Sequence, residues 1–484
     1  MNQALKGVSA LLALLAVICL IRVFSLPAPA APGAAAPAVD LDGPGAVQRL
    51  AAALRIPTVS YGEPEKNDPA QFDAFAQHLQ RNFPRAHAAL TREAVGKSLL
   101  FTWAGREPGA RPLLLLAHMD VVPVEPGTEG AWTHPPFGGV VADGQIWGRG
   151  ARDDKSSVLA LMESVEWLLA HDFVPGRTVY LAFGHDEEIG GKDGAKKIAA
   201  LLKSRGVQAD LLDEGSAVLT GGLIAGVQRP VAAIMTAEKG YYTVKLTVRA
   251  EGGHSSRPPP VTAISRLARA VARVQDQPMP TRLVSPVTDM FDRLAPEMAF
   301  GRRFALANRW LFGPLLRRTL AAGQTTNTSV RTTTATTVFH AGVKDNVLPS
   351  EAWALVNFRL LPGDSIAAVR AHVRSVVDDD QVELSDYGFA DEPSPVSSTD
   401  SDSFRLIERT VGEIFPDAVV TAGLVTGATD ARNYDGVYAT RYNFAPQVLA
   451  PADLPTIHGT DERIGVDNYL TMVRFYVQLL RNAG

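Results

Sequence analysis

The stretch GHDEEIGG, at residues 184–191, places three consecutive carboxylates directly after the apolar run VYLAF. The run predicts a buried strand, so Asp186, Glu187 and Glu188 are expected where that strand ends. Carboxylates this close disfavour each other's ionisation, and a metal ion is the strongest local compensator for them. The stretch therefore suggests a metal centre, with a solvated acidic turn as the alternative.

Histidines and carboxylates also follow other apolar runs. These positions are His118 with Asp120, Asp153 with Asp154, Asp213 with Glu214, and His458. Each has a simpler explanation by itself, since a lone histidine at a strand end is often structural and an Asp pair before a helix often caps free N–H groups. Together, two histidines and three carboxylates suit two zinc ions that share one carboxylate, as in hydrolytic two-metal sites. The only cysteine, Cys19, lies in the N-terminal apolar segment, which leaves His, Asp and Glu as ligands in the folded body.

The elements around these clusters predict an α/β fold, in which a catalytic domain has a largely parallel central sheet flanked by helices. Residues 113–116 predict a buried strand that leads to His118, and residues 156–171 predict an amphipathic helix after Asp154. Ligands in open α/β sheets gather at the carboxyl ends of the strands, where these charged clusters stand.

A second unit begins near residue 240, where apolar and polar residues alternate. Strands are expected at 244–249, 332–342 and 351–361, and helices at 261–274 and 365–377. We therefore expect an inserted α+β lid or dimerisation domain at 238–385, between two parts of the catalytic domain at 45–237 and 386–484.

Within this insert, residues 286–325 contain the basic and apolar stretch FGRRFALANRWLFGPLLRR. It is either an amphipathic element that approaches lipid or an oily substrate, or a helix that packs on its own domain.

Residues 1–26 predict a signal peptide or a membrane anchor. Lys6 precedes an apolar run whose length fits the core of a signal peptide, about 7–15 residues. Arg22 is equally compatible with a short single-pass anchor, because its long side chain can reach the membrane interface. The Pro/Ala-rich residues 27–44 predict an extended linker. We expect an exported protein, periplasmic/extracytoplasmic or membrane-tethered.

The chain has 484 residues, of which 46% are hydrophobic and 20% charged, and its formal net charge is −4. This length is ample for a large core and favours two domains. Without a long basic run or a basic balance, the sequence gives no indication of a nucleic-acid partner.

Six motifs carry a family resemblance: HMDVVPV, GRGARDDK, HDEEIGG, LDEG, GGHSS and HGTDE, in that order. In residues 45–480 the chain resembles the aminoacylase and carboxypeptidase S family of di-zinc peptidases, metallopeptidase family 20. The stretches SRGVQADLLDEG, RTTTATTVFHAGVKDNVLP and VNFRLLPG resemble the branch that contains Gly-X carboxypeptidase and the secreted N-fatty-acyl-amino-acid synthase/hydrolases.

The resemblance implies two Zn²⁺ ions per subunit, with other divalent metals as alternatives. The implied ligands are His118, Asp153, Glu188, Glu214 and His458. Asp153 would bridge the ions, and His118 and Glu188 would bind different ions. Relatives differ in which acid of LLDEG serves, so Asp213 is the alternative to Glu214.

The resemblance also implies the catalytic groups. Glu187 would be the general base, Asp120 would support His118, and His254 would stabilise the oxyanion from the lid of a partner subunit. A homodimer formed through the lid is therefore expected. Asp186 is expected to cap or orient backbone nearby.

Three further residues match substrate-binding positions of the family: Asn346, Arg359 and Arg432. Arg359 or Arg432 would bind the free α-carboxylate of the substrate in a bidentate pair. The one departure is Asp461 in HGTDER, where some relatives have Asn.

Together these residues predict a di-zinc metallohydrolase that cleaves the amide bond preceding a free C-terminal amino acid, as a carboxypeptidase or an N-acyl-amino-acid hydrolase. A dipeptidase or a deacylase with the same site is the alternative. A non-catalytic metal-containing binding protein is disfavoured, because the expected base, Glu187, is present.

Overall fold

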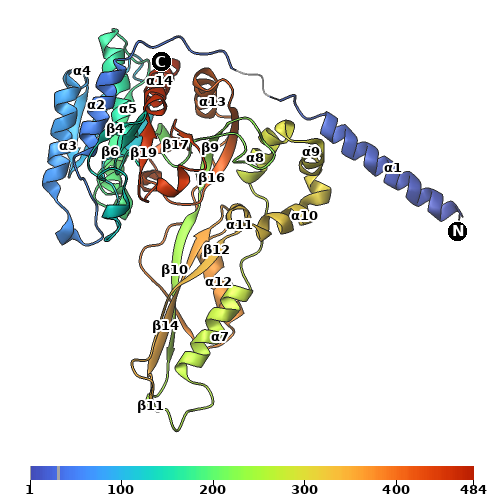
Figure 1. Cartoon of the computed structure of the whole chain (residues 1–484). Coiled ribbons are helices and arrows are strands. Elements are labelled where there is room, and N and C mark those ends of the chain that lie inside the picture. The colour runs from blue at the N-terminus through green and yellow to red at the C-terminus, as the bar shows by residue number, and fades with distance from the viewer. Residues whose placement is uncertain (1, 30–32) are drawn as a thin grey trace.

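The computed structural model describes residues 2–29 and 33–484. A large α/β body contains the C-terminus, and a long, narrow α+β body projects from it (Figure 1). Helix α1 (Asn2–Phe24) extends away from both bodies and meets the rest of the chain near its own C-terminal end.

A ten-stranded, mixed but mostly parallel sheet forms the centre of the large body. Its strand order is β1-β2-β6-β3-β7-β17-β9-β8-β18, and β16 pairs with β9. The strands are β1 (Thr91–Val95), β2 (Ser98–Trp103), β3 (Leu113–His118), β6 (Val179–Gly184), β7 (Ala209–Asp213), β8 (Val218–Leu219), β9 (Val231–Glu238), β16 (Val419–Val425), β17 (Tyr438–Asn443) and β18 (Val448–Leu449). The predicted α/β class with a largely parallel central sheet is confirmed.

Helices cover both faces of this sheet. The helices of the large body are α2 (Gly43–Leu54), α3 (Pro69–Asn82), α4 (Pro84–Ala89), α5 (Lys155–Ala170), α6 (Ala195–Ser204), α13 (Asp402–Ile414) and α14 (Val466–Ala483). Within β3, Leu113 and Leu115 pack in the core that contains α5, whereas Leu114 and Leu116 pack in the core that contains α6. Because successive side chains of a strand point to opposite faces, a strand covered on both sides reads as a continuous apolar run. Burial of each of these leucines contributes roughly 1.5–3 kcal/mol.

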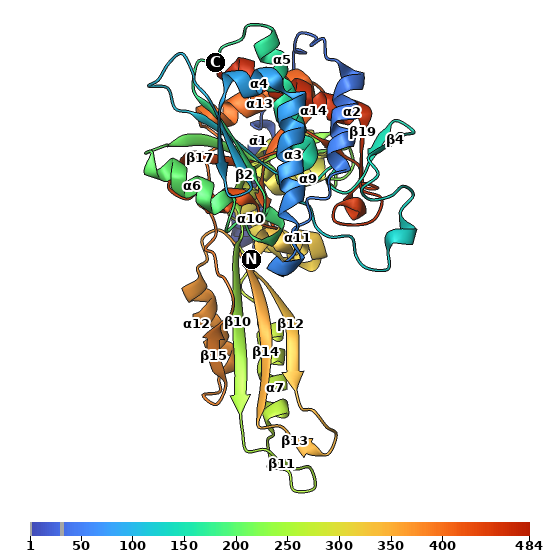
Figure 2. The ribbon, with the colours of Figure 1, turned by 90° about the vertical axis from the view of Figure 1, so that its left-hand side faces the viewer.

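The narrow body, called the lid from here on, contains a four-stranded antiparallel sheet in the order β12-β14-β10-β15 (Figure 2). Its strands are β10 (Gly240–Arg249), β12 (Thr333–Ala341), β14 (Glu351–Leu360) and β15 (Glu383–Asp386), with helices α7 (Ala263–Asp276) and α12 (Ile366–Val377). Both helices share one hydrophobic core with the sheet. The short pair β11 (Gly253–His254) and β13 (Val347–Leu348) forms the lid tip.

Between α7 and β12 the chain returns to the large body. This segment contains α8 (Val287–Leu294), α9 (Phe300–Ala307), α10 (Arg309–Ala322) and α11 (Gln324–Val330). Val287, Phe291 and Leu306 pack in one core with Val231 of β9 and Val419 of β16. The expectation that residues 286–325 pack as one helix on their own domain is therefore wrong in both respects. Several short helices form, and they pack on the large sheet.

Candidate functional site

Three of the expected side chains meet at one edge of the large sheet. Strands β3 and β6 are parallel neighbours, and His118 at the end of β3 lies opposite Gly184 at the end of β6. A short 3-10 helix, Glu187–Ile189, follows β6 directly. Since the carboxyl ends of parallel strands share an edge, the histidine and the two glutamates are brought together by the strand order.

A small three-stranded sheet brings two further loops to this edge. Strand β5 (Gln145–Trp147) pairs with both β4 (Val140–Ala142) and β19 (Arg463–Gly465). Asp153 lies in the loop after β5, and His458 lies in the loop before β19. The pairing of β5 with β19 therefore brings together two candidate ligands that lie far apart in the sequence.

His118, Asp153, Glu188 and His458 form one cluster. His118 Nε2 lies 2.8 Å from Asp153 Oδ1, and His458 Nε2 lies 3.0 Å from Asp153 Oδ2. His458 Nε2 is also 3.3 Å from Glu188 Oε2. One ligand atom from each of His118, Asp153 and Glu188 lies within 4.8 Å of the other two. Asp153 is thus the central carboxylate, with one oxygen toward each imidazole.

The cluster carries an excess of negative charge. Hydrogen bonds with Asp153 and Glu188 raise the pKa of His458 to about 10. Burial alone would lower the pKa of His118, but hydrogen bonds with Asp120 and Asp153 outweigh it and raise this pKa well above the usual value. A site that attracts protons this strongly also attracts metal cations, which displace protons from imidazole when they bind.

The side chains present fit a metal ion. Glu188 Oε1 is buried and has no hydrogen-bond partner among the residues that the structure describes. Leaving such an oxygen unpaired costs about 1–3 kcal/mol, which a coordinated cation would offset. Imidazole and carboxylate together suit Zn²⁺ and other divalent transition metals.

The structure distinguishes Glu214 from Asp213. Asp213 ends β7, and both of its carboxylate oxygens accept backbone N–H groups, from Glu214 at 2.9 Å and from Ala431 at 2.8 Å. Burial raises the pKa of Glu214 well above its usual value, and the neighbouring charge of Asp153 raises it further. Within the described residues, the Glu214 carboxylate accepts no hydrogen bond. It is therefore the better candidate for completing a second metal shell.

Glu187, the expected base, lies in a strongly acidic and mostly buried environment. Burial raises its pKa well above the usual value, and the negative charges of Asp430, Glu188 and Asp120 act in the same direction. Asp120 accepts the backbone N–H groups of Glu187 and Glu188, each at 3.2 Å, and its Oδ1 lies 3.4 Å from His118 Nδ1. One carboxylate thus fixes both the glutamate turn and the imidazole.

The two remaining acids of these motifs have supporting contacts. Asp186 accepts the N–H groups of Asp193 and Gly194, at 2.7 and 2.8 Å, directly before α6. Asp154 stands at the N-cap of α5 but makes no capping hydrogen bond, and its carboxylate accepts the N–H of His118 at 3.3 Å. The simpler explanation of the Asp pair as a helix cap is therefore wrong, and the orienting contacts expected for Asp186 are confirmed.

Four side chains stack where the lid joins the large body. Arg359 Cζ of β14 lies 4.7 Å from the ring centroid of Tyr241 in β10. Tyr241 stacks on Phe389 with ring centroids 4.4 Å apart. Arg432 Cζ lies 5.6 Å from the ring centroid of Phe389. Burial lowers the pKa of Arg359, and the positive charge of Arg432 lowers it further. Among the described residues, neither guanidinium has a carboxylate within ion-pair distance. An anion is the missing partner that this arrangement favours.

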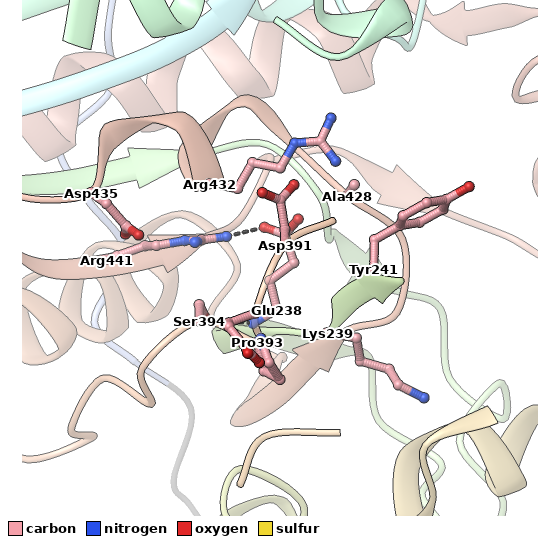
Figure 3. Close-up of a pocket in the computed structure, with 11 residues that line it drawn as sticks. Glu238, Lys239, Tyr241, Asp391, Pro393, Ser394, Ala428, Arg432, Asp435 and Arg441 are labelled. Atoms are coloured by element: carbon pink, nitrogen blue, oxygen red, sulfur yellow. Dashed lines mark hydrogen bonds and ion pairs between the residues drawn. The ribbon is translucent and has the colours of Figure 1, made fainter. Parts of the chain in front are cut away.

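Arg432 connects this stack to the glutamate turn. A Cβ atom built on Gly190 would lie 3.6 Å from Arg432 Nη2, so the guanidinium lies beside the end of the turn that carries Glu188. Arg432 and Tyr241 also line a cavity of about 90 Å³ at the junction of lid and body (Figure 3). The ion pair between Glu238 and Arg441 forms part of its wall.

The remaining two expected residues lie elsewhere. His254 and Asn346 are exposed at the lid tip, where Ser255 N–H donates to the Asn346 carbonyl at 3.2 Å. Tyr241 and Arg359 pair at the opposite end of the lid sheet, about 30 Å away at the rise of an extended strand. Within one chain, therefore, the structure does not bring His254 or Asn346 to the cluster.

Two carboxylates beside the cluster, Glu462 and Asp430, were not predicted from the sequence. Glu462 is fully buried and accepts hydrogen bonds from Arg149 Nη1 at 2.8 Å, from Arg152 N at 2.8 Å and from Asp153 N at 3.2 Å. These hydrogen bonds hold the Asp153 loop against the His458 loop. In the sequence, the only indication of this role is that Glu462 lies four residues after His458. Asp430 had no signal beyond its place in TDAR. Burial raises its pKa well above the usual value, and the charge of Asp213 adds to this.

Comparison with known proteins places the chain among peptidases. The sequence model of peptidase family M20/M25/M40 matches residues 114–482. The chain is 41% identical over 440 residues to probable carboxypeptidase S-like 2 of Dictyostelium discoideum, covering 90% of this chain and 84% of the relative. It is 42% identical over 443 residues to the N-fatty-acyl-amino acid synthase/hydrolase PM20D1 of Xenopus tropicalis, covering 90% and 85%.

Solved structures share the fold at low sequence identity. A metallo-carboxypeptidase of the M20 family from Sulfolobus solfataricus superposes with a TM-score of 0.67 at 17% identity, over 90% of this chain and 99% of the other. A dinuclear metal-binding M20 peptidase from Bacillus subtilis superposes with a TM-score of 0.57 at 12% identity, over 91% and 98%.

Proposed function

The chain belongs to peptidase family M20/M25/M40 and is a metal-dependent hydrolase, and we propose that it cleaves the amide bond preceding a free C-terminal amino acid. The substrates are peptides or N-acyl amino acids. The names of the relatives support both classes, since one is a probable carboxypeptidase and another acts on N-fatty-acyl amino acids.

The observation that carries this proposal is the pair of arginines without acidic partners. Arg359 and Arg432 flank the Tyr241–Phe389 stack, and Arg432 lies beside the turn that carries Glu188. A guanidinium binds a carboxylate through two parallel hydrogen bonds, which fixes orientation as well as charge. A substrate held by its terminal carboxylate would therefore present its last amide bond to the metal cluster.

Two zinc ions are the cofactors that we propose. His118, Asp153, Glu188, Glu214 and His458 would hold them, with Asp153 shared between both. Bound zinc would supply Lewis-acid polarisation of the amide carbonyl and a lowered pKa for water. The unpaired Glu188 Oε1 supports this assignment.

Glu187 would move the proton. A carboxylate whose pKa is raised well above its usual value is a stronger base than an ordinary carboxylate, so it accepts a proton from water more readily. Glu187 would take the proton of the attacking water and deliver it to the amide nitrogen as the C–N bond breaks. Asp120 holds the backbone of the turn during both transfers.

His254 would act in a second copy of the chain. Ser256 N–H donates to His254 Nδ1 at 3.1 Å, which leaves the ring proton on Nε2. An outward Nε2–H is a donor suited to an oxyanion. We therefore propose a homodimer formed through the lids, in which His254 and Asn346 of each lid tip complete the site of the other subunit.

We also propose export of the protein. Residues Leu5–Phe24 form one helix with a mean hydropathy of 2.5, which fits a signal sequence or a membrane anchor. The catalytic body would then lie outside the cytoplasm or be tethered to the outer face of a membrane.

Hydrolysis of a matched substrate panel tests the function. The purified full chain would be incubated with a benzyloxycarbonyl-Gly-Leu peptide, its C-terminal amide and oleoyl-Phe, before and after chelation and with zinc added back. We expect chelator-sensitive release of the amino acid from the free acids, restored by zinc, and little release from the amide.

Each result has a defined meaning for the proposal. Faster cleavage of oleoyl-Phe than of the peptide would narrow the activity to acyl-amino-acid hydrolysis. Equal cleavage of the acid and the amide would overturn carboxylate recognition, and turnover that survives complete metal removal would overturn the metal mechanism.

A further inference from the structure

Among the described residues, the apolar helix α1 contacts the body near its C-terminal end. Its buried residues Cys19 and Val23 face the start of α10, where Asn308 Nδ2 donates to the Cys19 carbonyl at 3.1 Å. Arg22 Nε donates to the Ala307 carbonyl at 3.1 Å. The C-terminal end of α1 is therefore fixed against the α9–α10 junction, and the rest of the helix projects away (Figure 1).

The whole of α1, including the last turns that contact the body, has the length and composition of a membrane span. Its apolar stretch is 20 residues long, and only 11% of its most apolar window is buried in the protein. Twenty helical residues extend about 30 Å, the thickness of a bilayer's hydrocarbon core. Exposed apolar residues cover its surface from Leu5 to Phe24. No other part of the described chain covers this surface.

The neighbouring helices expose apolar side chains beside this attachment point. On α10, Trp310, Leu311 and Leu315 are 54%, 39% and 59% exposed, and Phe300 at the start of α9 is 50% exposed. Leu311 and Leu315 are four residues apart and therefore lie on one face of α10, and Trp310 directly precedes Leu311. Elsewhere on the helix, Leu316 and Leu320 pack on the core shared with β16. A helix of a soluble protein normally has a polar outward face, so the apolar outward face of α10 is unusual.

Basic residues border this apolar face. Arg317 and Arg318 directly follow Leu316, and neither forms an ion pair with any described residue. Arg309 is paired with Asp292 at 2.7 Å, so its charge is already compensated. Tryptophan and arginine together are typical of the membrane interface, where the ring lies among the headgroups and the guanidinium binds phosphate.

We propose that the exposed face of α9 and α10 rests on a lipid bilayer with anionic headgroups, into which α1 is inserted. Residues Phe300, Trp310, Leu311 and Leu315 enter the headgroup region, and Arg317 and Arg318 bind lipid phosphates. Because Asn308 and Arg22 fix α1 to the same helices, insertion of α1 places this face at the membrane surface. The large body would thus be held against the bilayer, whatever substrate it cleaves.

Native tryptophan fluorescence tests this arrangement in the full chain. The protein is reconstituted into vesicles of phosphatidylcholine and phosphatidylglycerol at three to one, with or without lipids brominated near the headgroup. Bromine quenches only nearby tryptophans. The variant Trp310→Phe removes the reporter, and Trp353→Phe on the lid strand β14 is the matched control. A parallel flotation assay reports whether the chain is inserted.

We expect several-fold stronger quenching of the wild type and of Trp353→Phe than of Trp310→Phe. The double variant Arg317→Gln/Arg318→Gln should reduce this quenching in anionic vesicles but not in pure phosphatidylcholine. Flotation without Trp310 quenching would overturn the proposal, and so would a chain that does not float. Trp310 protected only in a concentration-dependent dimer would assign this face to a second copy of the chain instead.

Discussion

The strand-end edge of the large sheet and the tip of the lid hold two groups of candidate catalytic residues in opposite environments. At the sheet edge, His118 and Asp153 lie 2.8 Å apart in a buried, acidic cluster that one chain assembles by itself. At the lid tip, His254 is exposed and makes its side-chain contact only within its own turn, through Ser256 N–H. One chain therefore assembles the proposed metal cluster by itself and leaves the proposed lid-tip residues exposed.

The difference indicates how each half is stabilised. The buried half is held by hydrogen bonds between distant segments, such as those of Glu462 to the Asp153 loop. The exposed half is held only by the β11–β13 pairing and local turns. A buried cluster of like charges requires cations for its stability, whereas an exposed donor requires only a partner that reaches it.

Replacement of the base should give the largest effect, because it removes the proton transfer that the sheet edge performs alone. Glu187→Gln should lower kcat by about 10²–10⁴-fold while metal content is retained. Steady-state kinetics with the free-acid substrates and metal analysis of the same samples measure both quantities. Near-normal turnover would show that Glu187 is not the general base.

Removal of the lid-tip imidazole should have the next largest effect. His254→Ala should lower kcat by about 10²–10³-fold, the usual loss for one oxyanion donor, with little change in thermal stability because the side chain is exposed. His340→Ala, at an exposed histidine of β12 in the same lid, is the matched control and should leave kcat unchanged. An effect confined to KM would instead assign His254 to substrate binding.

Mixing these two variants tests whether the halves come from different chains. In a heterodimer of Glu187→Gln and His254→Ala subunits, one of the two sites has both an intact base and an intact imidazole. Random exchange of an equal mixture should restore about a quarter of the wild-type sites. Activity that does not recover after subunit exchange has been verified would mean that each lid serves its own body.

The arginines proposed to bind the substrate carboxylate lie where the lid joins the large body, between the two regions. Replacing one of them should lower activity less than the changes above. Arg432→Met should lower kcat/KM for free-acid substrates by about 10–100-fold, the value of a charge-assisted bidentate pair. The C-terminal amide should be affected much less, because it offers no negative charge. Equal losses on the acid and the amide would mean that Arg432 acts on the glutamate turn beside Gly190 and not on the substrate.

Features of the fold and of the candidate site could be predicted from the sequence where they depend on residues close together in the chain. Local periodicity predicted a helix at 156–171, and α5 spans Lys155–Ala170; it is buried around most of its circumference, which the amphipathic pattern did not indicate. The order of motifs was enough to identify the candidate ligands. His118 and Glu188 follow neighbouring parallel strands, whereas Asp153 and His458 are brought together by the pairing of β5 with β19, which local pattern does not indicate.

Contacts between distant segments were not predictable in this way. Nothing local to Phe389 indicates that it stacks between Tyr241 and Arg432, since the contact depends on how the chain returns from the lid. The helices at 287–330 have an ordinary amphipathic pattern, which specifies an apolar face but not the surface that covers it. The backbone hydrogen bonds that Asp213 accepts, which favour Glu214 as the candidate ligand, have no signal in the local sequence.

The aromatic stack should give the smallest effect and the finest test of the link between lid and body. Phe389→Leu keeps an apolar contact but removes the stack with Tyr241 and the cation–π contact with Arg432, together worth about 0.5–1.5 kcal/mol. KM for free-acid substrates should therefore rise by roughly threefold to tenfold, with kcat and metal content unchanged. Tyr387→Leu, an exposed aromatic residue two positions away, is the matched control. If both variants alter kcat to the same extent, the segment after β15 that contains Tyr387 and Phe389 governs lid movement. The stack would then have no role in orienting Arg432 toward the substrate carboxylate.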